Sequence, residues 1–255
     1  MPKGIYSAAS AMYVESQALD VASRNLAHAT STGYRRETAF RDGFDQVLAQ
    51  KGRNGGVKGD GGIGIISTGS TFSFQEGSRE QTGGTLDMAL AGDGFFRLQK
   101  PDGGVLLTRA GHFQTDPQGR LISPDGLLVQ GQGGAITIPA EAEGVSIDRR
   151  GRVSIASTQG GIRTEQVVDQ IRVVRVEQPQ AMRPINGQLF DPGDQAQVDS
   201  AAEVHQGSLE KSNVEPLREL VEMIAIQRRY DAAQKALKEQ ASVGQGFSDL
   251  LRGNG

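Results

Sequence analysis

The sequence predicts an α+β fold, with long N- and C-terminal helices paired as a coiled-coil-like domain and a central, mostly antiparallel β domain between them in the chain. Three observations predict it. Apolar residues recur at helical spacing near both ends of the 255-residue chain. Short apolar runs bounded by turn residues fill the middle. The 35 glycines are about twice the average share, yet none lies between residues 5 and 29.

The N-terminal helix is expected from about residue 5 to residue 29. Thr-Ser-Thr-Gly at residues 30–33 then ends it, because these residues compete for backbone hydrogen bonds or tolerate a positive φ. Glu15 occupies one position of a heptad seam that is otherwise apolar and rich in alanine, which favours close helix packing. The other members of this seam are Ile5, Ala8, Met12, Leu19, Ala22, Leu26 and Ala29.

A glycine-rich segment follows the first helix. Seven of the thirteen residues from Gly52 to Gly64 are glycine, and such a segment is costly to order. Residues 59–64 match the GxGxxG pattern of dinucleotide-binding proteins, but that motif needs a strand before it and a helix after it. Here glycine-rich residues precede it and strand-like residues follow. We therefore interpret residues 51–64 as a flexible loop.

The middle of the chain, to about residue 177, has the pattern of a β domain. Turn sequences such as Asp116-Pro117-Gln118-Gly119 separate its apolar runs, and no helical pattern intervenes, which favours an antiparallel sandwich or barrel. The expected strands lie at residues 65–74, 95–98, 105–108, 127–129, 135–138, 145–147 and 153–155. Residues 178–202 are polar and contain three prolines, so we expect a hairpin and a return connection there.

The C-terminal helix is expected to begin near Pro216, whose missing N–H has no partner to lose in a first helical turn. Ser212 and Asn213 are available as caps. Its seam contains Met223, Ile226, Tyr230, Ala233, Leu237, Gln240, Gly244, Phe247 and Leu251, and Leu217, Leu220 and Ile224 form an offset apolar stripe. We divide the chain into a helical assembly domain (1–50 plus 205–255), the glycine-rich loop (51–64), and a central β domain with its return connection (65–204).

Composition excludes several classes of function. Without cysteine there is no disulfide, thiol nucleophile or iron–sulfur cluster, and the three histidines lack metal-ligand spacing. A net charge of −3 provides no field to gather nucleic acid. No window approaches the length of a membrane span, and the first residues do not read as a cleaved secretion signal. We expect no metal, cofactor, nucleic acid or small-molecule substrate, in a chain that is soluble or exported without cleavage.

Candidate catalytic residues are few. Asp42 with Asp45, and Asp191 with Asp194, form carboxylate pairs, but nothing near them suggests the apolar pocket that would separate two carboxyl pKa values. We interpret them as turn or cap residues. His112 has no accompanying GxSxG nucleophile motif, so we interpret it as a partly buried strand histidine.

The terminal helices are the candidate functional surface. Because their seams are narrow, a single helix pair leaves apolar surface uncovered, and such surface is typical of an assembly contact. The residues predicted at this interface are Ile5, Met12, Leu19, Leu26, Leu217, Leu220, Met223, Ile226, Tyr230 and Leu237.

Three groups of short motifs stand in order along the chain. The first is Arg24-Asn25-Leu26-Ala27-His28 with Thr30-Ser31-Thr32-Gly33-Tyr34. The second is Gly92-Asp93-Gly94-Phe95-Phe96 with Thr108-Arg109-Ala110-Gly111-His112-Phe113. The third is Leu209-Glu210-Lys211-Ser212-Asn213-Val214 with Glu219-Leu220-Val221-Glu222-Met223-Ile224 and Gln227-Arg228-Arg229-Tyr230. In these motifs the chain resembles the axial proteins of the bacterial flagellum, specifically the rod and hook group. Arg24 and His28 stand where that family usually has asparagine.

The resemblance implies a structural subunit of the flagellar basal-body rod, without enzymatic activity. Such a subunit would self-assemble into a helical tube that transmits torque for motility, with the terminal helices forming the inner coiled-coil domain. Implied partners are further copies of the chain, other flagellar rod and hook proteins, and the type III export apparatus, which exports members without cleaving a signal peptide. The length favours the larger rod proteins, proximal or distal.

Two other classes of function stay open on the residues alone. One is a secreted or envelope binding module, in which the β domain recognises a ligand and the helices form a trimeric stalk. The other is a peptidoglycan-acting envelope enzyme, which would need a cleft with two carboxylates in unlike environments.

Overall fold

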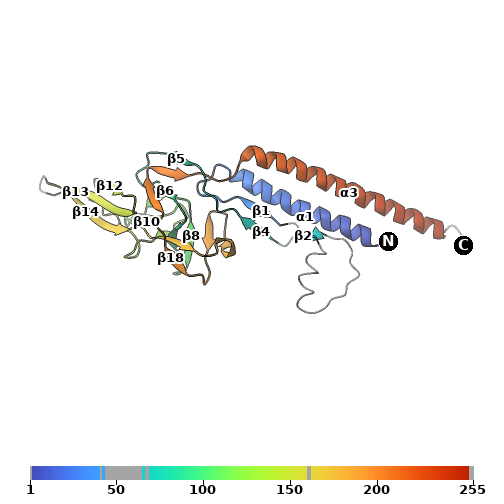
Figure 1. The fold of residues 1–255 in the computed structure, drawn as a ribbon, viewed down its shortest axis with the longest axis horizontal. Coiled ribbons are helices and arrows are strands. Elements are labelled where there is room, and N and C mark those ends of the chain that lie inside the picture. The colour runs from blue at the N-terminus through green and yellow to red at the C-terminus, as the bar shows by residue number, and fades with distance from the viewer. Residues whose placement is uncertain (1, 41, 44–64, 67–68, 160–161, 253–255) are drawn as a thin grey trace. The chain divides into compact units, whose positions relative to one another are not determined.

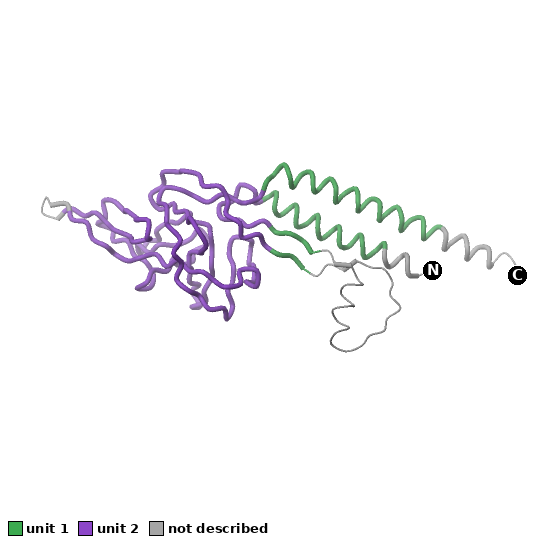
Figure 2. The backbone as a smooth tube through the Cα atoms, viewed as in Figure 1, with its two compact units in different colours: residues 1–27, 37–71, 215–255 green, residues 28–36, 72–214 purple. Residues whose placement is uncertain are grey.

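The computed structural model describes residues 2–40, 42–43, 65–66, 69–159 and 162–252 (Figure 1). These form two compact units (Figure 2). Unit 1 takes its described residues from Met1–Ala27, Glu37–Thr71 and Glu215–Gly255, and unit 2 from His28–Arg36 and Phe72–Val214. Residues 28–36 and 205–214 thus group with the strands of unit 2. The glycine-rich loop expected at 51–64 lies outside the described residues.

Two helices dominate unit 1, as the apolar periodicity predicts. They are α1 (Pro2–Ala27) and α3 (Pro216–Arg252), and they pack against each other along α1. Contacts between Asn25 and Glu219 and between Glu15 and Arg229 show that the helices run antiparallel. α3 begins at the proline expected to start it. Within the described residues, no helix combines the length and apolar character needed to cross a lipid bilayer.

Short strands lie along the side of α1 that faces away from α3 (Figure 1). β1 (Glu37–Ala39) pairs with β4 (Ser70–Phe72), and β2 (Asp42–Gly43) pairs antiparallel with β3 (Ile65–Ile66). α1 contacts both β1 and β3. Unit 1 is therefore layered, with α1 between α3 and the strands.

The described residues of unit 2 form strands and one 3-10 turn, η1 (Pro179–Ala181). Its strands are β5 (Arg79–Gln81), β6 (Met88–Ala91), β7 (Phe95–Gln99), β8 (Val105–Thr108), β9 (Gln114–Thr115), β10 (Leu121–Ile122), β11 (Leu128–Val129), β12 (Gly144–Ile147), β13 (Arg152–Gln159), β14 (Ile162–Gln170), β15 (Val173–Val176), β16 (Arg183–Pro184), β17 (Leu189–Asp191), β18 (Gln197–Asp199), β19 (Glu203–Gln206) and β20 (Ser208–Glu210). The expected α+β class is confirmed, and β16 and β17 form the hairpin expected in the return segment.

Strand β7 is central to a nine-stranded antiparallel sheet. It pairs with β8 along one edge and with β11 and β15 along the other. Successive side chains point to opposite faces, so Phe96 and Leu98 enter one hydrophobic core and Phe95 enters a second. Both faces of β7 are covered, which explains its nearly continuous apolar run. The remaining strands form a three-stranded sheet, β12-β13-β14, and the pairs β5-β20 and β6-β19.

Two turns of unit 2 share the pattern Asp-x-x-Gly-Arg, beginning at Asp116 and Asp148. In each, one carboxylate oxygen accepts backbone N–H groups two and four residues later at 2.8–2.9 Å, and the other accepts the arginine Nε at 2.7 Å. The glycines, Gly119 and Gly151, have φ of +76° and +78°, a conformation that favours glycine. These turns confirm the expected use of glycine between strands.

Three local expectations were wrong. The segment expected as one strand at residues 65–74 contains two short strands, β3 and β4, because Gly69, with φ of +129°, and residues 73–74 are not in a strand. Residues 135–138 form no strand, because Ala135 bridges Gln130 while Thr137 bridges Arg120, and a ladder needs one continuous partner. α1 ends at Ala27, so Ala29 lies beyond the helix.

Acid is expected to weaken unit 2 through these turns. Burial raises the pKa of Asp116 and Asp148, but hydrogen bonds from the arginine and from backbone N–H groups outweigh it and lower the pKa overall. A lowered folded pKa stabilises the protein above the unfolded value of about 3.9, and this stabilisation is lost as pH falls through the folded pKa. Urea unfolding followed from about pH 5 to pH 2 should show a steeper loss of stability in the parent than in the Asp116→Asn, Asp148→Asn double variant. Parallel curves would contradict this.

Candidate functional site

Asn25, a motif residue of α1, joins three elements of unit 1. Its side-chain NH2 donates to the Glu37 carbonyl at 2.8 Å, and its side-chain oxygen accepts the Glu37 N–H at 2.9 Å. The side chain thus satisfies both backbone groups of a β1 residue, as a neighbouring strand would. The same NH2 donates to the Glu219 carboxylate on α3 at 3.3 Å. Asn25, 1% exposed, therefore fixes the end of α1 against β1 and α3.

Charged side chains support the same helix pair. Arg24 donates to both Glu37 carboxylate oxygens at 3.1 Å. Glu15, the polar position of the predicted seam, is buried and accepts the Arg229 Nε at 3.1–3.2 Å. Burial by itself lowers the pKa of Arg229, but hydrogen bonds and attraction to Glu15 and Glu222 raise it overall.

The structure brings only part of the predicted interface together inside the helix pair. Leu19, Met223 and Ile226 meet around Ala18 and Ala22, and only the two alanines and Ile226 are fully buried. The alanine-rich side of the seam therefore faces α3, while its larger residues lie at the edges. Met12, Leu26, Tyr230 and Leu237 are half-buried, Leu217 and Leu220 are exposed, and the side chain of Ile5 lies outside the described residues.

Four large apolar side chains form an exposed stripe on α3, here called the α3 stripe. Their spacing of i, i+3, i+4 and i+7 places them on one face of the helix. The buried residues Glu219 and Ile226 lie half a helical circumference away, so the stripe is on the side of α3 opposite α1. The stripe consists of Leu217 (77% exposed), Leu220 (45%), Val221 (62%) and Ile224 (52%).

A buried ion cluster in unit 2 gathers the motif segments. The Glu210 carboxylate accepts the Arg35 Nη2 at 2.7 Å, the Arg109 Nη1 at 3.2 Å and the Gly77 N–H at 2.9 Å. The two guanidinium groups also donate to the backbone carbonyls of Gln75 and Gly92, each at 2.7 Å. All three charged side chains are at most 3% exposed. One carboxylate therefore ties together segments from across the whole unit.

The cluster holds two positive charges against one negative charge. Burial, the largest influence, lowers the pKa of Arg35, and attraction to Glu210 opposes it. The Arg109 guanidinium carbon lies 5.4 Å from the Phe95 ring centroid, a distance at which a cation gains from the ring's negative face. The contacts with Glu210 and with the Phe95 ring thus both offset the free-energy cost of removing the Arg109 guanidinium from water.

Two motif glycines permit close backbone contact. Gly33 has φ of +67°, and a Cβ there would lie 2.2 Å from the Ala110 backbone nitrogen. A Cβ on Gly111 would lie 1.6 Å from the Met88 carbonyl oxygen. Gly33 also donates its N–H to the Glu210 carbonyl at 2.8 Å. The first, second and third motif groups therefore meet at Gly33.

Neighbouring motif residues complete the junction. Tyr34 is buried and stacks on His28, with ring centroids 4.7 Å apart. Asn213 does not cap α3, because its side chain bonds the Arg36 N–H and the Ser73 and Gln75 carbonyls. The Ser212 hydroxyl accepts the N–H of the buried Val214 rather than that of a helical residue.

The remaining motif residues either support the sheet of unit 2 or lie near the end of α1. The Thr108 hydroxyl donates to the Gln188 carbonyl at 2.8 Å, and the rings of Phe96 and Phe113 pack edge to face. Gly94 packs so closely on Val173 that a Cβ would lie 2.9 Å from its Cγ1. Ala27, the last residue of α1, and Thr30 are exposed.

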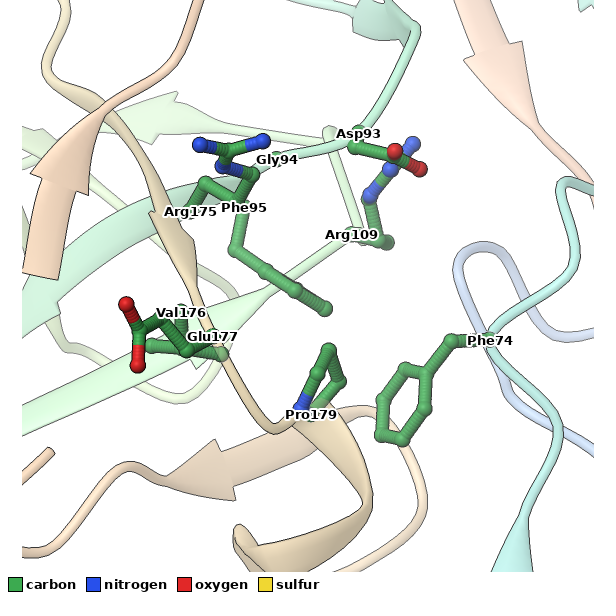
Figure 3. A pocket seen from close by; sticks show the side chains of 9 residues that line it. All are labelled: Phe74, Asp93, Gly94, Phe95, Arg109, Arg175, Val176, Glu177 and Pro179. Atoms are coloured by element: carbon green, nitrogen blue, oxygen red, sulfur yellow. The ribbon is translucent and has the colours of Figure 1, made fainter.

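A cavity of about 540 Å³ opens beside the cluster (Figure 3). Its apolar lining includes Phe74, Phe95 and Pro179, and its charged lining includes Asp93, Arg109, Arg175 and Glu177. Asp93 and Glu177 are both exposed, so this cavity does not provide the unlike carboxylate environments that a glycosidase requires. Among the described residues, no three histidine, aspartate or glutamate side chains converge where a metal could bind.

The structure shows where His112 and Asp191, two of the candidate catalytic residues, lie. His112 was expected to be partly buried, but its side chain is 58% exposed. Its neighbours Gly111 and Phe113 are buried, and its Nδ1 lies 2.7 Å from the Asp87 carboxylate. Asp191 accepts the Gly193 N–H at 2.9 Å, which confirms a turn role. Asp45 lies outside the described residues.

Sequence patterns did not indicate the roles of Arg35, Glu37, Glu210 and Glu219. Glu210 and Glu219 stand inside the third motif group, and Glu219 also lies in the first turn of α3, where a carboxylate favours the positive end of the helix dipole. Periodicity finds apolar faces, whereas a buried pair 175 residues apart leaves no periodic trace.

Comparisons with known proteins agree over both units. Residues 89–155 match the family described as flagellar hook protein FlgE/F/G D1 domain, and residues 205–244 match flagellar basal body rod FlgEFG protein C-terminal. The flagellar basal-body rod protein FlgG of Bacillus subtilis is 31% identical, over 99% of this chain and 100% of the relative. FlgF of Caulobacter vibrioides is also 31% identical, over 98% of each chain. FlgG of the same bacterium is 29% identical, over 97% of this chain and 99% of the relative.

Replacing Glu210 should destabilise unit 2 strongly. In Glu210→Gln, two buried guanidinium groups lose their counter-charge, and breaking a buried pair costs about 3–5 kcal/mol. The control is Glu80→Gln, because Glu80 pairs with Lys211 at the surface and such pairs contribute about 1 kcal/mol or less. Urea unfolding measures the unfolding free energy that each variant loses relative to the parent chain. A similar small loss in both would show that the cluster contributes little.

Replacing Gly33 tests the junction of the motifs. Gly33→Ala adds a clash with Ala110 to the cost of a positive φ, whereas Gly126→Ala adds a methyl group at φ +79° in open space. We expect the control to lose about 1 kcal/mol and Gly33→Ala at least about 3 kcal/mol of unfolding free energy, measured by urea denaturation. Equal losses would mean that the close approach is unimportant.

Proposed function

We propose that this chain, which belongs to the family of flagellar basal-body rod proteins, joins the rod through the α3 stripe. The family is structural and non-enzymatic, and the chain is a structural subunit of the rod. Membership implies assembly with rod proteins. The surface that makes these contacts is the part we propose.

The exposed stripe is the observation that carries the proposal. Four large apolar side chains on a single helix face are unusual on a chain that stays alone in water. Full burial of one such side chain is worth about 1.5–3 kcal/mol. Covering the stripe therefore supplies a driving force of several kcal/mol, which can offset part of the entropy lost when subunits associate.

The proposed partners are further copies of this chain and other flagellar rod and hook proteins. The resemblance supports export by the flagellar type III apparatus without cleavage of a signal peptide, and torque transmission through a helical tube. A helical tube needs a contact between two different surfaces, because a contact between identical surfaces closes as a dimer.

A charge in the stripe should block assembly and leave the fold intact. Val221→Asp places a carboxylate where apolar contact is expected, and a loss of about 1.4 kcal/mol raises the concentration needed for polymerisation tenfold. Because Val221 is exposed, the unfolding free energy should change by only about 0.5 kcal/mol. The matched control is Val198→Asp, at an exposed valine of β18. Sedimentation measures the fraction of each variant that polymerises, and we expect it to fall for Val221→Asp but not for Val198→Asp. Unchanged polymerisation of Val221→Asp would refute the role of the stripe.

A further inference from the structure

Unit 1 carries a groove on the side opposite the α3 stripe. It is a cavity of about 300 Å³ between α1 and the strands β1 and β4, here called the α1–β1 groove. Its lining includes Gln17, Asp20, Val21, Arg24, Ala39 and Ser70. All of these residues belong to unit 1, so the groove and the stripe lie on one compact body.

Helix geometry places the two surfaces on opposite sides of that body. Residues of α1 that face α3, such as Glu15 and Ala22, lie half a circumference from Gln17 and Arg24, which line the groove. The α3 stripe likewise points away from α1. Figure 1 shows the same order of layers, with α1 between α3 and the strands β1 and β4.

The two surfaces are chemically complementary. The groove has an apolar floor at Val21 and Ala39. The exposed aromatic residue Tyr13 lies beside it. Tyr13 belongs to the same surface because its hydroxyl accepts the Gln17 side-chain NH2 at 2.7 Å. These apolar groups match a stripe of leucine, valine and isoleucine.

Charge favours the same pairing. The exposed carboxylate of Asp20 lies at the rim of the groove. The exposed cation Arg228 continues the α3 stripe by one helical turn beyond Ile224. Among the described residues, neither Asp20 nor Arg228 takes part in an ion pair, so each is available to a partner.

We propose that the α3 stripe of one copy packs into the α1–β1 groove of a second copy. This rests on the proposed function and names the surface that receives the stripe. Each added copy covers one surface and leaves the other open, so the contact repeats from copy to copy and forms an open helical array when the rotation between copies does not close a ring. A contact between two stripes would instead stop at a dimer and leave both grooves empty.

Cross-linking tests this pairing, because the natural chain has no cysteine and each introduced cysteine is unique. Val221→Cys and Ser70→Cys chains are mixed, polymerised and treated with a short bismaleimide. We expect a covalent dimer at twice the 27.1 kDa chain mass on a denaturing gel. The matched control replaces Ser70→Cys by Thr158→Cys, at an exposed residue of β13, and should give no such band.

The outcomes separate this inference from the proposed function. Polymers in which Val221→Cys cross-links only to itself, or equally to Thr158→Cys, would overturn the pairing and leave rod assembly through the stripe intact. Absence of polymer in the parent and in both cysteine variants, with helix content unchanged by circular dichroism, would overturn both. A dimer that forms only from the Val221→Cys and Ser70→Cys mixture supports the pairing.

Discussion

The carboxylate of Glu210 holds two guanidinium groups from residues 175 and 101 positions away in the chain. Around it meet the chain's first entry into unit 2, the central sheet and the last segment before the chain leaves the unit. In a medium of low dielectric constant, a buried charge without an opposite charge beside it destabilises the fold. Moving any of these three side chains apart would therefore cost free energy. Gly33 adds a steric condition, because the entering segment touches the Ala110 backbone. Electrostatics and close packing therefore fix the same junction.

Unit 1 follows a different principle. Its helices are held by small residues and polar bonds, with Ala18, Ala22 and Ile226 buried and Asn25 bridging three elements. Alanines allow close approach but bury little apolar area, so much of the apolar surface of α3 stays uncovered. The apolar surface that α3 leaves uncovered is the basis of the assembly contact that we propose.

The structure explains why several motif residues have the residue types they have. The Asn25 side chain makes the two hydrogen bonds with the Glu37 backbone that a neighbouring strand would make. Gly33 and Gly111 lack a Cβ, which would clash with the backbone that packs against each of them. Arg24, beside Asn25, makes a bidentate contact with Glu37. The motifs therefore mark places where the geometry accepts few alternatives.

By itself the sequence determined the α+β class, the start of α3, most central strands and the glycine-containing turns, because these depend on local periodicity and on φ preferences. That the terminal helices carry the assembly surface stays a prediction. Only the tertiary structure decided that Glu210 pairs with Arg35 and Arg109, that Asn213 binds backbone rather than caps a helix, and which face of α3 is exposed. These outcomes depend on contacts between residues far apart in the chain. Local spacing carries no record of such contacts, since it specifies which side of an element is apolar but not what lies against it.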